Sequence, residues 1–365
     1  MSDEQPQMTP SQMTPSQQSQ QSQPGDPYRP FFLEAHRRFT LIGVGLCVTI
    51  AFWVGLNIVL SGLLRPLFPG PGGAPMWLSM LISSGPLYAV AMPLGLTVLS
   101  RVPALKAREF PLGGKRFWML MVACFPIMTV GGLIGNWLSQ AVSGGATTNR
   151  VSDMVMQSDP WVNALFVVLL APIFEEWLFR RQIIDRTRRY GERTAIVLSA
   201  FTFALFHMNL YQFFYAFGIG LVLGYAYMRT GRLRYCIIMH MVINTSGSLV
   251  GPAILKLVGS GGGDVAKLTD GSMSEAEMMR LAETNPTAMA GVMLLGLYGV
   301  LLVALTIAGA VIIALHARRL EFYDPPEQLP KWYGARLAFL NPGMAVYVVL
   351  TIVLGLWQMR LITLL

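Results

Sequence analysis

Charged residues are scarce in this sequence. Only 13% of its 365 residues are Asp, Glu, Lys or Arg, and 53% are hydrophobic, whereas about a quarter of an ordinary soluble domain is charged. Several apolar runs reach the roughly 20 residues that a helix needs to cross a bilayer. The composition excludes an ordinary soluble domain. It predicts an all-α fold, a polytopic transmembrane helical bundle of about 8–9 spans with a disordered N-terminal tail.

Cysteine is also rare, with three residues in the chain. Cys47, Cys124 and Cys236 each lie within an apolar run, and no two of them have the spacing of a disulfide framework or a cysteine-rich metal site. They are expected to be small core residues. The sequence also has no HExxH motif, which excludes the zinc site typical of zincins.

An apolar leader is absent from the beginning of the chain. Residues 1–28 are rich in Gln, Ser and Pro, and MTPSQ occurs twice, at 8–12 and 13–17. Such a segment buries too little apolar surface to fold, so a disordered tail is expected at 1–30. Without a cleavable signal peptide, the first membrane helix is expected to direct insertion.

The apolar runs predict nine membrane spans. Their approximate ranges are 39–63, 76–100, 117–142, 160–181, 194–209, 212–228, 235–256, 288–315 and 339–360. Five segments on one side of these spans hold 21 of the 27 Lys and Arg residues, namely 1–38, 101–116, 180–193, 229–234 and 317–338. Basic residues favour the cytoplasmic side, so the sequence predicts a multi-pass integral membrane protein, in the plasma membrane, with a cytoplasmic N-terminus.

The net charge of +8 fits this topology. Because the basic residues lie between the apolar runs, they are interpreted as topology signals, and no nucleic acid is expected as a partner. The segment 257–287 has an excess of acidic residues, and is expected to be a polar external loop with a short amphipathic helix at 274–283.

One membrane segment carries two adjacent carboxylates. In PIFEEWLFRR, Glu175 and Glu176 follow an apolar run, and Arg180 lies four residues after Glu176. Acidic residues inside a membrane are costly and usually mark a functional site. The alternative is that Glu176 and Arg180 form a buried helical salt bridge that only fixes packing.

Two of the four histidines also lie inside apolar helices. His207 ends FALFH, with Phe203 four residues before it, and His240 begins HMVIN, with Asn244 four residues after it. This spacing places each pair on one face of its helix. Taken singly, each of these polar residues is as well explained by packing between helices. The hypothesis of a functional site therefore depends on the occurrence of all of them together.

The depths of these motifs are comparable. If the fourth and fifth spans form an antiparallel hairpin that turns at 190–191, Glu175 and His207 both lie about 24 Å from the turn. The three motifs are then expected to share one polar cavity that opens toward the cytoplasm. Pro172 is expected to kink the helix before the carboxylates.

Such a cavity is suited to hydrolysis. A carboxylate beside a histidine holds and deprotonates water, which favours Glu175 as the base and the Glu176–Arg180 pair as its support. His240 and Asn244 supply donors for an oxyanion. Zinc (Zn²⁺) bound by Glu175, His207 and His240 is the alternative. Sequence spacing does not separate these two, and no other cofactor is indicated.

The three motifs together resemble those of a known family. EEWLFR, FALFH and HMVIN match, in order and character, the EExxxR, FxxxH and HxxxN/B motifs of the CPBP intramembrane proteases, the CAAX-protease and bacteriocin-processing (Abi) family. The resemblance covers about residues 160–256. It implies a bundle of about eight helices and a membrane-embedded peptidase, described either as a metalloprotease or as glutamate-dependent.

The resemblance implies a role for each residue of the motifs. Glu175 and His207 activate water, His240 and Asn244 form the oxyanion hole, and Glu176, Arg180 and Phe203 shape the site. The implied organisation is a tail at 1–30, N-terminal membrane helices at 31–158, the catalytic core at 159–256, the external loop at 257–287 and C-terminal membrane helices at 288–365. The implied partners are the lipid bilayer and a membrane-associated peptide or protein, such as a CAAX-like end or a precursor peptide.

Two other functions use the same residues without proteolysis. A non-catalytic immunity or scaffold protein could bind a peptide or partner in this cavity. A transporter could use the Glu and His side chains as a proton or ion relay, although no inverted repeat of the kind found in transporters is evident in the sequence.

Overall fold

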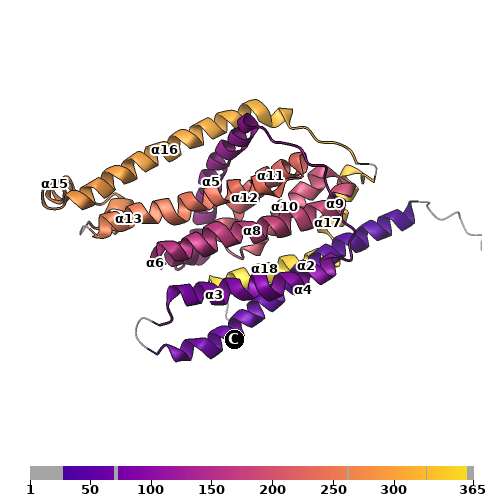
Figure 1. Ribbon diagram of the computed structural model, residues 1–365, viewed down its shortest axis with the longest axis horizontal. Coiled ribbons are helices and arrows are strands. Elements are labelled where there is room, and N and C mark those ends of the chain that lie inside the picture. The colour runs from indigo at the N-terminus through magenta and orange to yellow at the C-terminus, as the bar shows by residue number, and fades with distance from the viewer. Residues whose placement is uncertain (1–27, 70–72, 261–262, 326, 360–365) are drawn as a thin grey trace, which may run out of the picture.

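The computed structural model describes residues 28–69, 73–260, 263–325 and 327–359, and no strand occurs in these ranges. The all-α fold predicted from the composition is therefore confirmed. Most of the predicted tail at 1–30 lies outside the described residues. The long helices lie roughly side by side, as expected of a membrane bundle (Figure 1).

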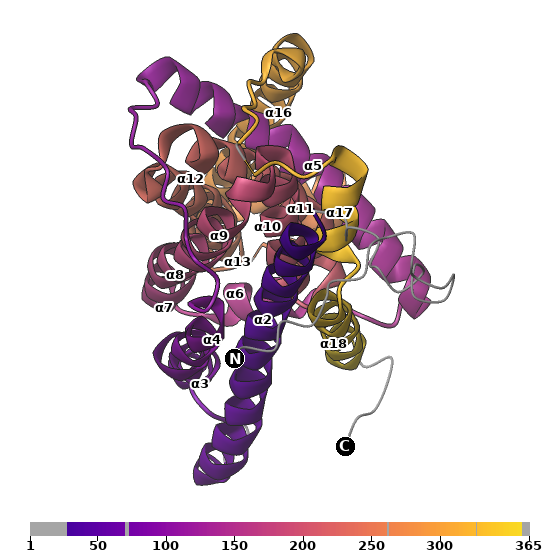
Figure 2. The ribbon, with the colours of Figure 1, turned by 90° about the vertical axis from the view of Figure 1, so that its right-hand side faces the viewer.

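The first half of the bundle contains three long helical segments. These are α2 (Arg29–Leu64), the run formed by α3 (Met76–Pro86), a π-helical turn and α4 (Met92–Leu99), and α5 (Gly114–Ser143). Helix α2 packs between α4 on one side and α18 (Pro342–Gln358) on the other (Figure 2). Glycine allows the second contact, because a Cβ at Gly43 would lie 2.2 Å from the backbone of Gly343. Such close approach between small residues is typical of helices that associate in membranes.

The second half carries the predicted motifs. A short helix, α6 (Arg150–Gln157), leads into one continuous helix, Pro160–Tyr190, which contains α7 (Pro160–Val162), α8 (Ala171–Glu176), α9 (Asp185–Thr187) and two π-helical stretches at 163–170 and 177–184. It is followed by α10 (Glu192–Phe206), α11 (Leu210–Thr230), and the run of α12 (Leu233–Thr245) and α13 (Gly251–Ser260). The remaining helices are α14 (Val265–Asp270), α15 (Glu275–Thr284), α16 (Pro286–His316) and α17 (Lys331–Phe339).

The number of spans differs from the nine predicted. The described residues contain seven helices long and apolar enough to cross a membrane, or eight if α17 and α18, which are bent by 58°, form one span. The segment predicted at 194–209 does not qualify, because α10 has 15 residues. At 1.5 Å per residue it reaches about 22 Å, less than the hydrocarbon thickness of about 30 Å. It is surrounded mainly by protein, since 11 of its residues are buried.

The segment 257–287 contains the short helix predicted in it. The helix expected at 274–283 is α15, and Ser274 begins it with a capping box, in which the Ser274 hydroxyl accepts from the Glu277 amide and the Glu277 carboxylate accepts from the Ser274 amide. In Figure 1 this helix lies at the end of the bundle opposite α9 and α17.

The basic segments meet at one end of the bundle, which we call the arginine-rich end. The amide of Leu105 donates to Asp185 O at 2.6 Å, the amide of Phe110 to Thr230 O at 2.8 Å, and the amide of Leu329 to Tyr190 O at 3.2 Å. Residues from 101–113, 185–193, 229–235 and 320–331 therefore pack together. This agrees with the alternation of charge along the sequence.

Candidate active site

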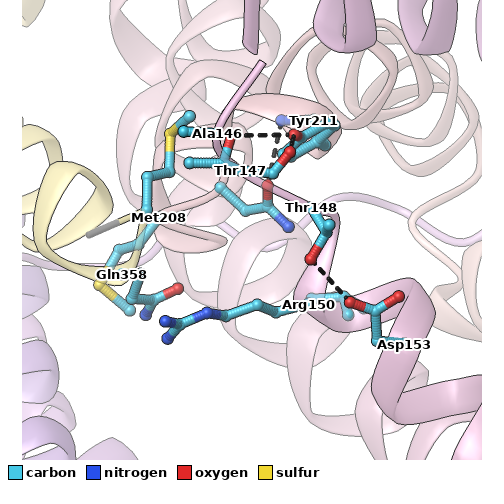
Figure 3. Close-up of a pocket in the computed structure, with 11 residues that line it drawn as sticks. Ala146, Thr147, Thr148, Arg150, Asp153, Met208, Tyr211 and Gln358 are labelled. Atoms are coloured by element: carbon cyan, nitrogen blue, oxygen red, sulfur yellow. Dashed lines mark hydrogen bonds between the residues drawn. The ribbon is translucent and has the colours of Figure 1, made fainter. Parts of the chain in front are cut away.

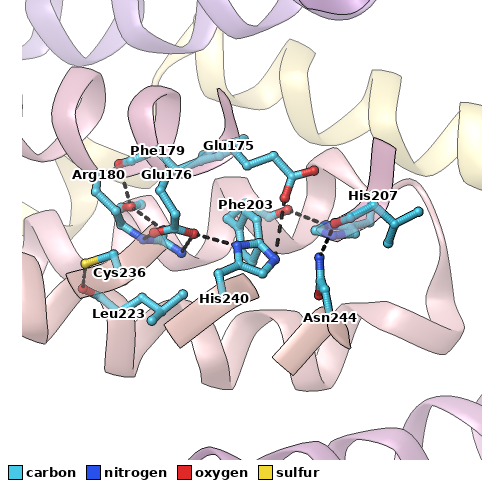
Figure 4. Close-up of polar contacts among 12 residues, drawn as sticks. Glu175, Glu176, Phe179, Arg180, Phe203, His207, Leu223, Cys236, His240 and Asn244 are labelled. Carbon is cyan, nitrogen blue, oxygen red and sulfur yellow. Dashed lines mark hydrogen bonds and ion pairs between the residues drawn. The ribbon is translucent and has the colours of Figure 1, made fainter. Parts of the chain in front are cut away.

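The Glu176 and Arg180 side chains form a completely buried ion pair. They lie one helical turn apart on the helix Pro160–Tyr190, both are 0% exposed, and Arg180 Nε is 2.9 Å from Glu176 Oε2. The i,i+4 spacing in the sequence predicts this pair, and the structure contains it (Figure 4).

The rest of the Arg180 guanidinium is held by α10. Its Nη1 donates to Ser199 Oγ at 3.0 Å, and the Ser199 hydroxyl donates to Phe179 O at 2.7 Å. The guanidinium carbon also lies 4.8 Å from the centre of the Phe203 ring, which is a cation–π distance. Arg180 thus joins the helix Pro160–Tyr190, which we call the carboxylate helix, to α10, which ends beside His207.

His240 lies between the two carboxylates. Its Nδ1 is 3.0 Å from Glu176 Oε1, and its Nε2 is 3.9 Å from Glu175 Oε2. Because Glu176 is ion-paired with Arg180 and acts only as an acceptor, Nδ1 is the donor of the shorter contact. This bond orients the imidazole and leaves Nε2 on the Glu175 side.

Glu175 is the more accessible of the two carboxylates. Its side chain is 15% exposed, against 0% for Glu176. It has no direct cationic partner besides His240 among the described residues. Tyr88, whose ring stacks on Phe174 at 4.3 Å, and Tyr215 lie in its vicinity.

His207 lies at the end of α10. Its Nδ1 is 2.8 Å from Phe203 O, and its ring packs edge-on against the Phe203 ring at 4.8 Å. The next residue, Met208, has φ of +48°, in the left-handed region that non-glycine residues seldom adopt. His207 and Glu175 share no hydrogen bond or ion pair in the described part of the chain. Phe203 instead links His207 to His240, because its ring packs against both histidine rings (Figure 4).

Asn244 lies one turn after His240 on α12. Its Nδ2 donates to Val167 O at 2.9 Å. Val167 belongs to the π-helical stretch at 163–170, which is the kind of distortion often found at functional sites. This contact uses one of the two N–H bonds of the Asn244 amide and leaves the other for a ligand.

The donors do not form a metal site as they are placed. Within the ranges described, no group of three or more His, Cys, Asp or Glu side chains has the arrangement needed to hold a metal ion. In particular, His240 and Glu175 approach each other no closer than 3.9 Å. Zinc binding by Glu175, His207 and His240 stays a prediction.

Two cavities adjoin the motifs. The first, which we call the α6 groove, has a volume of about 410 Å³. Its lining comes from α5, α6, the stretch at 163–170, α11 and the run from α12 to α13, and it includes Asn244, Val167, Gln212 and Tyr215. The groove is therefore continuous with the site on its Asn244 side.

The second cavity, which we call the Arg150 pocket, measures about 390 Å³. Met208 and Asn209, which directly follow His207, line it together with Thr147, Arg150 and Gln358. Figure 3 shows the Arg150 and Gln358 side chains in this pocket. Both cavities lie toward the end of the bundle opposite the arginine-rich end, whereas the sequence predicted a cavity that opens toward the arginine-rich side.

The comparison with known families agrees with this site. Residues 157–246 match the family described as type II CAAX prenyl endopeptidase, Rce1-like. The predicted resemblance to a CPBP family intramembrane protease is thus confirmed. The Rce1-like segment contains all seven motif residues and supports a protease that works within the membrane. No curated protein and no solved structure matches the chain.

Sequence reasoning found the motif residues of the Rce1-like segment but missed their supports. The structure links Arg180, Glu176 and Phe203 around His240, places Glu175 on the other side of the His240 ring, and leaves His207 and Asn244 at the edge of this group. Ser199, Tyr88 and Tyr215 were not predicted. Ser199 had a weak signal, since it is a polar residue one turn before Phe203 on the same apolar helix.

Proposed function

We propose that this protein is an intramembrane endopeptidase that hydrolyses a peptide bond of a membrane-associated substrate, either a CAAX-like end or a precursor peptide. The observation that carries the proposal is the unequal placement of two adjacent carboxylates. Glu176 is neutralised by Arg180, while Glu175 is partly exposed beside His240. Glu175 has no Arg or Lys partner among the described residues, so it is able to take a proton.

In the proposed reaction, Glu175 removes a proton from water, assisted by His207. The hydroxide attacks the peptide carbonyl carbon, and the carbonyl oxygen becomes an oxyanion. His240 Nε2, when protonated, and the free N–H of Asn244 donate to this oxyanion. The tetrahedral intermediate then breaks its C–N bond, and the proton held by Glu175 passes to the amine that leaves.

Glu176, Arg180 and Phe203 hold the reacting groups in place. Glu176 fixes the orientation of His240 by accepting from its Nδ1. Arg180 keeps Glu176 ionised. Phe203 provides the surface against which both histidine rings pack.

The proposed setting is the plasma membrane, with the N-terminus and the arginine-rich end in the cytoplasm. We propose the glutamate-dependent mechanism over the metalloprotease one, because the three zinc ligands predicted from the sequence do not gather into a metal-binding group. Chelation of the purified protein followed by restoration of zinc tests this choice. Zinc-dependent recovery of cleavage contradicts it.

The test of function compares protein termini in membranes from cells that carry the native chain, Glu175→Gln or Glu283→Gln at matched abundance. Glu283 is exposed and far from the motifs in the sequence, so it is the matched control. Glu175→Gln is expected to reduce defined new termini at least about a hundredfold, the usual contribution of a general base. Unchanged termini in a folded Glu175→Gln protein contradict the proposal and favour a binding role.

A further inference from the structure

The arginine-rich end of the bundle is closed above the site. The segments 101–113 and 320–331 cover it and bond to the helix backbones there. Beneath them, Arg186 Nε donates to Leu99 O at 2.8 Å, and the Tyr227 hydroxyl donates to the carboxylate of Asp185 at 3.1 Å. Between this layer and Glu176, the side chains of Phe179 and Ile183 are 0% exposed. In the part of the chain that the structure describes, these buried residues and covering segments lie between the arginine-rich end and the carboxylates.

The opposite side of the site is open. The α6 groove reaches Asn244, and the Arg150 pocket reaches the two residues after His207. Both cavities share Val151 as a lining residue, so α6 and the segment before it lie between them. Figure 1 places α6 at the end of the bundle away from α9 and α17.

We infer that the substrate is a peptide delivered to the face of the membrane opposite the arginine-rich end, and that it reaches Glu175 through the α6 groove. Because basic segments favour the cytoplasm, this face is the non-cytoplasmic one. The inference rests on the proposed function and selects between its two substrate classes. It favours an exported precursor peptide over a peptide end held at the cytoplasmic surface.

The lining of the groove suits an extended peptide. Asn149, Ser152, Gln212 and Asn244 offer amide and hydroxyl groups to a peptide backbone, and the other lining residues are largely apolar, including Met128, Met156, Ile243 and Leu255. A volume of about 410 Å³ lies in the range of sites that enclose small ligands, so the groove holds a short segment of peptide. No charged side chain lines it, which indicates that the bound segment is uncharged.

Thiol labelling tests the direction of access without requiring any activity. Gly247 lines the groove, and a Cβ there meets no atom within 4 Å. A membrane-impermeant maleimide is applied to intact cells and to inverted membrane vesicles carrying Gly247→Cys or Lys106→Cys, with the parent chain as background. Lys106 is exposed on the segment that covers the arginine-rich end. Gly247→Cys is expected to react in intact cells, and Lys106→Cys only in inverted vesicles.

The other labelling patterns overturn the inference. If both cysteines react from the same side, or if Gly247→Cys reacts from neither, the groove does not open on the opposite face. If Lys106→Cys reacts in intact cells, the substrate is not an exported peptide. Because labelling needs no proteolysis, these outcomes are independent of the Glu175→Gln result.

Filling the groove tests its use by the substrate. Gly247→Leu is expected to lower the yield of Glu175-dependent termini at least tenfold, whereas Gly299→Leu, at an equally open position of α16, leaves it unchanged. Purified Gly247→Leu with native thermal stability and a native yield of termini overturns the assignment of the groove. If the native chain itself produces no Glu175-dependent termini, the proposed function fails, and the labelling result still decides the direction of access.

Discussion

Replacing Arg180 by Met is expected to leave Glu176 in the interior of the protein with His240 as its one remaining partner among the described residues. Both side chains are 0% exposed and lie 2.9 Å apart, so water cannot take the place of the guanidinium. Removal of one partner from such a pair costs about 3–5 kcal/mol. The substitution also removes the donor to Ser199 and the cation over Phe203, which places the expected loss at the upper part of this range.

The assay is equilibrium unfolding of the purified protein in mixed detergent micelles. Arg181→Met is the matched control, because Arg181 is the next residue on the same helix and is exposed. Its free energy of unfolding is expected to change by no more than about 0.5 kcal/mol. The double variant with Glu176→Gln is expected to lose less than the sum of the single variants, with a coupling of about 0.5–3 kcal/mol. Equal losses of unfolding free energy in Arg180→Met and Arg181→Met refute the argument that the buried Glu176 carboxylate depends on Arg180.

Two further substitutions test the fold. Gly309→Ala is expected to destabilise the protein by about 1–3 kcal/mol, because the new Cβ would lie 2.3 Å from Val122 O on α5. Gly299→Ala is the control, since its Cβ meets no atom within 4 Å and alanine favours the helix. Thermal unfolding in detergent measures the stability of both variants. Ser274→Ala is expected to weaken the first turn of α15 by about 1 kcal/mol, seen as faster amide exchange there. The bonds from Lys267 and Ser274 lower the pKa of Glu277 to about 2. The stabilisation of this cap by Glu277 is therefore complete above the ordinary pKa of Glu and is lost as the pH falls through about 2. Carboxyl NMR titration measures this pKa, and an ordinary value contradicts the cap.

Helical periodicity explains which parts of the site could be predicted. The i,i+4 spacing of Glu176 with Arg180 and of His240 with Asn244 fixes the faces that these residues share, whatever surrounds them. The surroundings depend on tertiary packing. Ser199 receives Arg180 only because α10 crosses beside the carboxylate helix, and a single sequence does not give that register.

The span predicted at 194–209 was wrong for a physical reason. The prediction assumed that an apolar segment is in contact with lipid, and that basic loops are exposed to water. Instead, α10 is apolar because protein surrounds it. The basic segments also pack on one another, and Glu192 binds Arg229 and accepts from the Tyr323 amide at 2.9 Å. Charge along the sequence thus predicted which segments meet at one end of the bundle, but not that they pack on one another.

The two carboxylates show why neighbours in sequence take separate proposed roles. Successive residues of a helix point about 100° apart, so Glu175 and Glu176 cannot face the same surroundings. Glu176 points toward α10 and α12, where Arg180 and His240 enclose it. Glu175 points away from Arg180 and keeps 15% of its side chain exposed. His240 contacts both carboxylates, one through each ring nitrogen, so it transmits the position of the buried pair to the accessible carboxylate. On this arrangement, loss of Glu176 is expected to act on the proposed reaction through the orientation of His240, while loss of Glu175 removes the proposed base.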